Sequence, residues 1–79
     1  MQTLTKILKE LERAKEVHPH FPSSLANQLH IIGEEFGETI QAYNKWNDDK
    51  TGSKKHIKEE LIQLGAMVLR TLENWVDEE

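Results

Sequence analysis

Two short acidic motifs hold the side chains best suited to chemistry. Glu35 and Glu38 lie three positions apart in the first motif, and Glu60 and Gln63 lie three positions apart in the second. In a helix this spacing puts both side chains of a pair on one face, with about 5 to 6 Å between their Cβ atoms. Carboxylate and amide oxygens are the ligands that hard divalent cations prefer. The motifs therefore predict a site for a hard divalent cation.

The two motifs also lie at matching distances from the segment between them. Residues 47–53 read Asn-Asp-Asp-Lys-Thr-Gly-Ser, a composition typical of a turn. At about 1.5 Å of rise per residue, Glu38 and Glu60 lie roughly 12 and 10 Å from this turn, and Glu35 and Gln63 roughly 16 and 15 Å. On antiparallel helices, three carboxylates and one amide oxygen would meet around one point.

An acidic run is more often a solvated helix face than a site, and the lysines near Glu59 and Glu60 suit ordinary surface pairs. Gly33 and Gly37 bracket the first acidic pair, although each lowers helix stability by about 1 kcal/mol relative to alanine. Such glycines indicate close approach of another group, which is either a ligand or a packed helix. The sequence leaves both interpretations open.

Three amphipathic segments must position these residues. Apolar residues recur every three or four positions and predict helices over Gln2–Val17, from Ser23 or Ser24 to near Trp46, and from Lys54 to Val76. Both prolines fall in the segment 18–22, which separates the first two helices. Ser53 is expected to cap the third helix, and Gly52 is free to take a positive φ in the turn before it.

The expected fold is all-α: one domain over residues 1–79, built on an antiparallel helical hairpin with one further helix against it. Several apolar residues fall outside the main stripes of the two hairpin helices, which suggests that each helix buries more than one face; they are Ala26, Ala42, Ala66, Met67, Leu69 and Val76. A homodimer or tetramer that completes a four-helix-bundle-like core explains this pattern, and a further C-terminal helix explains it equally well.

Length, charge and composition exclude several classes of function. A chain of 79 residues with 37% apolar residues has room for one small core, which favours an oligomer. A net charge of −4 argues against a nucleic-acid polymer as partner, and the lack of cysteine excludes thiolate chemistry. No apolar run approaches the roughly 18 residues of a membrane span, so a soluble, cytoplasmic protein without a membrane partner is expected.

The segment Leu25–Glu38, LANQLHIIGEEFGE, together with residues 18–22 before it and Glu59–Gln63 after it, resembles the MazG-like, all-α nucleoside triphosphate pyrophosphatases. Their pattern is E-x-x-E, a variable loop, then E-x-x-D, and the resemblance covers the chain from about residue 17 to residue 72. It implies a helical oligomer that uses Mg²⁺ to hydrolyse an NTP or dNTP to the monophosphate and pyrophosphate, cleaning the nucleotide pool.

Carried over by position, the resemblance implies that Glu35, Glu38 and Glu60 are catalytic metal ligands. Gln63 stands where the family has aspartate, so it is a weaker ligand, and Glu34 is either a general base or a surface residue. Carboxylates this close should titrate together, with at least one pKa raised. Candidates for substrate binding, each weighed against a solvated surface role, are Lys45, Lys54 and Lys55 for phosphate and Asn27 and His30 for the base.

The aspartate-to-glutamine departure at Gln63 keeps two alternatives open. One is a degenerate member of the family that retains the helical dimer or nucleotide binding without turnover. The other is a small helical interaction module whose acidic residues are only a solvated face.

Overall fold

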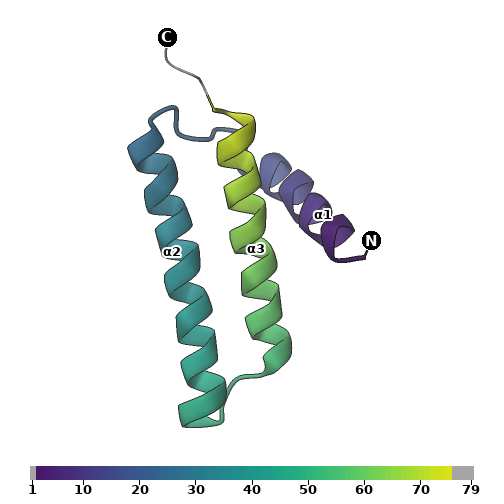
Figure 1. The fold of residues 1–79 in the computed structure, drawn as a ribbon, viewed down its shortest axis with the longest axis vertical. Helices are drawn as coiled ribbons and strands as arrows, with labels where there is room; N and C mark the ends of the chain where they lie inside the picture. The colour runs from purple at the N-terminus through teal and green to yellow at the C-terminus, as the bar shows by residue number, and fades with distance from the viewer. Residues whose placement is uncertain (1, 76–79) are drawn as a thin grey trace.

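The computed structural model describes residues 2–75, which form three α-helices and one short π-helical segment. Helix α1 spans Gln2–Val17, α2 spans Leu25–Asn44, η1 spans Lys45–Asp49 and α3 spans Lys54–Glu73. Helices α2 and α3 lie side by side and antiparallel, and α1 packs at an angle against α3 (Figure 1). No strand occurs within residues 2–75. The predicted all-α fold is confirmed.

Side-chain caps set where the hairpin helices begin. Ser24 Oγ accepts a hydrogen bond of 3.0 Å from the Asn27 backbone N–H, and Ser53 Oγ accepts one of 3.1 Å from the His56 backbone N–H. Both serines therefore satisfy an N–H group that a helix start leaves free. Helix α3 ends at Glu73, earlier than expected, where the Asn74 side chain donates to the Arg70 carbonyl. The predicted end at Val76 lies outside the described residues.

The turn between α2 and α3 differs from the prediction for Gly52. The residue with positive φ is Lys50, at 60°, where its N–H bonds to the Lys45 carbonyl and ends the π-helical segment. Gly52 instead allows a close approach, because an added Cβ would lie 3.2 Å from Lys45 Cβ and 3.3 Å from Trp46 N, both tight contacts. Sequence reasoning missed this because the turn formers do not show that α2 continues into a wider π turn.

The core is small and lies mainly between α1 and α3. Leu11, Ala14, Ala66 and Met67 are buried together, and partly buried apolar residues pack around them: Ile7, Phe21, Ile31, Ile32 and Leu69. The buried residues of α2 are small or polar, namely Gln28, Thr39 and Ala42. The fully buried positions of α2 are thus not those of its large apolar residues.

Many large apolar side chains of these two helices instead remain exposed. We define the apolar face as the exposed large apolar residues of α2 and α3: Leu25, Leu29, Phe36, Ile40, Tyr43, Leu61, Val68 and Leu72. Their spacing of three, four and seven residues keeps them on one side of each helix. In the part of the chain described here, no helix is long and apolar enough to cross a membrane.

A buried arginine ties α1 to α3. The Arg70 side chain donates to the His18 carbonyl at 2.7 Å and, more weakly, to the Ala14 carbonyl at 3.5 Å. Its guanidinium also lies 4.5 Å from the centroid of the Phe21 ring, within the range of a cation–π contact. Arg70 thereby satisfies carbonyls at the C-terminal end of α1 and holds the segment that follows.

We expect Arg70→Met to lower the free energy of unfolding by about 2 to 3 kcal/mol, because the partly buried His18 carbonyl and, more weakly, the Ala14 carbonyl lose a charged donor. Urea unfolding followed by circular dichroism measures this loss. Arg13→Met is the matched control, since Arg13 is exposed and, among residues 2–75, pairs only with Glu10 of its own helix, and it should change stability by less than about 1 kcal/mol. Equal midpoints for the two variants would show that the Arg70 contacts do not stabilise the fold.

Candidate metal centre

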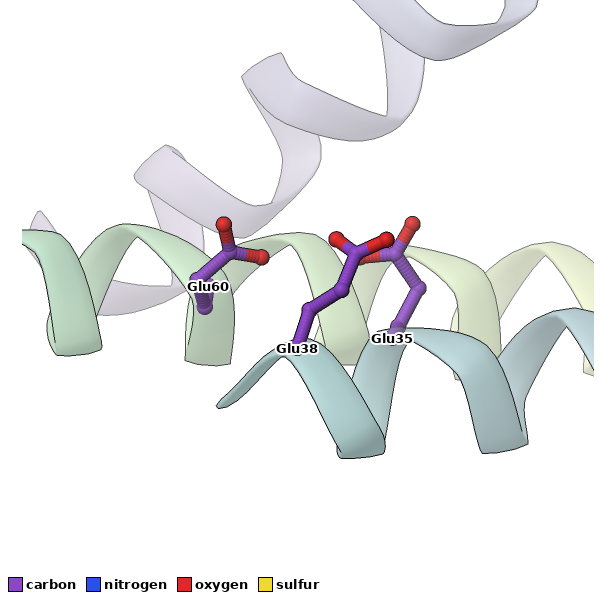
Figure 2. A group of neighbouring side chains, drawn as sticks. All are labelled: Glu35, Glu38 and Glu60. Carbon is purple, nitrogen blue, oxygen red and sulfur yellow. The ribbon is translucent and has the colours of Figure 1, made fainter. Parts of the chain in front are cut away.

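Three glutamates from the hairpin helices converge on one point. Glu35 and Glu38 extend from α2 and Glu60 extends from α3 toward the same side of the hairpin (Figure 2). One carboxylate oxygen of each residue lies within 4.8 Å of those of the other two. The i, i+3 spacing and the matching heights on antiparallel helices therefore bring these predicted residues together.

The cluster is partly withdrawn from water. Glu60 is only 8% exposed, Glu35 is half-buried and Glu38 is exposed. Glu35 Oε2 and Glu60 Oε2 are both buried without a hydrogen-bond partner. Buried polar atoms normally have a partner, because an unsatisfied one loses its hydration without compensation. A cation held between the carboxylates would supply what these two oxygens lack.

Few positive charges lie near the cluster. His56, one turn before Glu60, places Nε2 3.6 Å from Glu60 Oε1 and Nδ1 3.8 Å from Glu59 Oε1. Within residues 2–75, neither Glu35 nor Glu38 forms an ion pair. The protein itself therefore leaves most of the negative charge of the cluster unbalanced.

Burial and mutual repulsion shift the titration of two members. Burial is the main reason that the pKa of Glu35 lies above its ordinary value, followed by the charges of Glu38 and Glu60. The pKa of Glu60 is also raised, first by burial and then by the charge of Glu38, while His56 acts in the opposite direction. Burial first, and repulsion between the carboxylates second, thus raise the pKa of two members of the cluster.

A pocket of about 530 Å³ adjoins Glu35. This volume falls in the usual range for small-molecule sites. From α2 and α3 it is lined by Ile31, Glu35, Gln63, Met67 and Arg70, and from α1 and the segment after it by Glu10, Arg13, Ala14, His18, His20, Phe21 and Pro22. Gln63 is half-buried in this wall, one turn beyond Glu60, so it faces the same region as the cluster.

The remaining predicted site residues lie elsewhere on the surface. None of them is among the residues that line the pocket, and all are exposed: Asn27, His30, Glu34, Lys45, Lys54 and Lys55. Lys54 has a contact of its own, because its Nζ lies 5.2 Å from the centroid of the Trp46 ring. Their roles in substrate binding or proton transfer stay predictions.

Sequence reasoning missed the pocket wall. Arg13, His18, His20, Phe21 and Arg70 were not expected to share a cavity. A signal was present at Arg70, a lone basic residue among the apolar and small residues that end the third helix. The proline-bounded run of histidine and phenylalanine at 18–22 was a second signal, since it is too apolar for a plain linker.

Comparison of the chain with protein-family models, curated proteins and solved structures finds no match.

The raised pKa values predict how stability depends on pH in the absence of metal. Because folded Glu35 and Glu60 keep their protons above the ordinary carboxyl pKa of 4.5, the folded state binds more protons there than the unfolded state, and stability falls as the pH rises through this range. Glu60→Gln should remove part of this fall and raise the melting temperature near pH 7 in EDTA.

Thermal melts from about pH 4 to pH 8 measure the effect. Glu59→Gln is the control, since its carboxylate is 55% exposed and one position away on the same helix, and it should leave the profile nearly unchanged. A lower melting temperature for Glu60→Gln at every pH would contradict this account.

Proposed function

We propose that the protein is a Mg²⁺-dependent hydrolase that converts a nucleoside or deoxynucleoside triphosphate and water to the monophosphate and pyrophosphate. The observation that carries the proposal is the buried, unpartnered oxygen of Glu60 beside the carboxylates of Glu35 and Glu38. The resemblance of the two acidic motifs to the MazG-like pyrophosphatases supports the choice of reaction. Cleaning of the nucleotide pool is the role that this reaction suits.

The donor set fits a hard divalent cation. Glu35, Glu38 and Glu60 offer oxygen ligands only, and their separation of up to 4.8 Å leaves a gap in which a cation could lie. Gln63 would support the site as a weaker ligand through its amide oxygen. When bound, Mg²⁺ supplies charge neutralisation for the triphosphate and orders its oxygens for in-line attack at the α-phosphorus.

The surroundings suggest an orientation for the substrate. The pocket beyond Glu35 would take the nucleoside, because it combines the Phe21 ring with polar groups of His18 and His20. Lys54 and Lys55 lie about 8 to 9 Å along α3 from Glu60, toward the turn, where they would attract the pyrophosphate end. Glu34, exposed next to Glu35, remains the candidate general base.

Metal binding can be tested by its effect on stability, without measuring turnover. At 100 times its dissociation constant, Mg²⁺ or Mn²⁺ should add about 2.7 kcal/mol to the free energy of unfolding. Glu38→Gln should abolish most of this gain, because it removes one charge from the ligand set. Thermal melts with increasing metal concentration measure both, with the exposed Glu16→Gln of α1 as control. Unchanged melting of the wild type would favour a solvated acidic face.

Turnover is tested with each common NTP and dNTP in the presence of Mg²⁺, followed by separation of the products. We expect monophosphate and pyrophosphate from the wild type, and a rate lower by about 100-fold for Glu38→Gln, comparable to losing one strong electrostatic contact to the transition state. Phosphate as the sole inorganic product would indicate a different reaction.

Gln63 favours a second candidate function, that of a protein that binds a nucleotide but does not hydrolyse it. The reason is that an amide replaces the expected carboxylate in the pocket wall. Gln63→Asp separates the two. If the missing charge limits catalysis, this variant should bind Mg²⁺ more tightly and react faster than the wild type. Metal-dependent stabilisation with no product from either protein would establish the second candidate.

A further inference from the structure

One carboxylate in the pocket wall has no part in the proposed chemistry. Glu10 of α1 lines the pocket together with Glu35 and Gln63, and its side chain is only 16% exposed. The other acidic residues of α1, Glu12 and Glu16, are exposed and do not line this pocket. Glu10 is not among the three carboxylates that converge in the metal centre. A carboxylate that lines a pocket beside that centre is placed to contact the substrate.

Arg13 holds the Glu10 carboxylate in one orientation. Arg13 Nε donates to Glu10 Oε1 at 2.9 Å, and Arg13 Nη2 donates to Glu10 Oε2 at 2.6 Å. Such a bidentate pair fixes the plane of the carboxylate. Each carboxylate oxygen has about two lone-pair sites, so each keeps capacity for one further hydrogen bond. The pair therefore presents two oriented oxygens that can each accept from a ligand.

Glu10 belongs to the end of the pocket next to the metal centre. At that end Glu35 joins the pocket to the acidic cluster, and at the other end Arg70 bonds to the His18 carbonyl. Glu10 precedes His18 by eight positions, a distance of about 12 Å along α1. Burial is the main cause of the raised pKa of Glu35, and the charge of Glu10 contributes to it, as expected for carboxylates that lie near each other.

The part of the substrate at this end is the sugar. With the triphosphate at the metal centre and the base beside the Phe21 ring, the sugar spans the section between them. A carboxylate accepts hydrogen bonds and repels phosphate, so the favourable neighbour of Glu10 is a neutral donor. The 2′- and 3′-hydroxyls of ribose are two such donors on adjacent carbons. They match the two oxygens of one carboxylate.

We infer that the preferred substrate is a ribonucleoside triphosphate and that Glu10 selects it by accepting hydrogen bonds from the 2′- and 3′-hydroxyls, a role that rests on the proposed function. A deoxyribose would displace water from Glu10 without replacing one of these hydrogen bonds. Sites built to bind a hydroxyl discriminate strongly against an analogue that lacks it. Arg13 is a positioning residue here, because it orients the Glu10 carboxylate.

Hydrolysis of matched NTP and dNTP pairs by the full chain with Mg²⁺ tests this selection. We expect kcat/KM to be about 10- to 100-fold higher for each NTP, comparable to one hydrogen bond to a charged group. Glu10→Gln should bring this ratio to within about threefold of one, because the amide has one acceptor oxygen and no charge. The ratio compares two substrates on one protein, so a loss of folded protein does not change it.

Glu12→Gln is the matched control for Glu10→Gln. The Glu12 side chain lies on the same helix and is 71% exposed, so this variant should keep the wild-type ratio. An equal fall of the ratio in both variants would exclude a specific role for Glu10. A preference of the wild type that follows the amino groups of the base, with no dependence on the sugar, would place the base beside Glu10 and overturn the inference.

A 2′-deoxy-2′-fluoro nucleotide separates hydrogen bonding from the shape of the sugar. Fluorine keeps the ring pucker close to that of ribose but donates no hydrogen bond. We expect this analogue to react as slowly as the deoxynucleotide. Hydrolysis as fast as that of the ribonucleotide would contradict the assigned hydrogen bond to Glu10.

Failure of the sugar selection and failure of the proposed function give different results. Equal turnover of matched NTP and dNTP pairs by the wild type would overturn the role of Glu10 alone and leave a hydrolase. Absence of product from every triphosphate would overturn both.

Discussion

The close antiparallel contact between α2 and α3 determines the chemistry on both sides of the hairpin. Small and polar residues of both helices are buried, including Thr39 and Ala42 of α2 and Thr71 of α3. Because these side chains are short, the helices can approach closely and bring carboxylates from separate helices within one shared volume. The pKa values of Glu35 and Glu60 are raised there, first by burial and then by the charges of the neighbouring carboxylates.

The sequence predicts the helices and the acidic cluster because both depend on local spacing. Serine caps and the two prolines separate the helices, and the i, i+3 pairs define a face without reference to the rest of the chain. The convergence of Glu38 and Glu60 needed only one further assumption, an antiparallel turn of known length. The π-helical segment changes the shape of the turn but leaves α2 and α3 antiparallel. The wrong prediction for the turn therefore did not affect this convergence.

Other features depend on contacts between residues far apart in the chain. Periodicity predicts that Leu29 and Phe36 share a side of α2, but it does not tell which side meets α3. The buried residues Gln28 and Thr39 also share one side of α2, so helical spacing alone does not distinguish this side from the apolar one. Their burial follows from packing against the rest of the chain. Arg70 likewise bonds to Ala14 and His18, which lie 56 and 52 positions earlier in the chain. Local spacing therefore cannot predict the pocket wall that contains Arg70.

The two-sided hairpin constrains which changes of chain length the protein can accept. Adjacent residues such as Glu35 and Phe36 belong to opposite surfaces, so inserting or deleting one residue in the middle of α2 would rotate everything beyond it by about 100° relative to α3. Such a change would move the acidic side chains away from the cluster and bring apolar side chains toward it along half the helix. Variation in length should therefore concentrate in the connections at 18–24 and 50–53, where no helical phase has to be preserved.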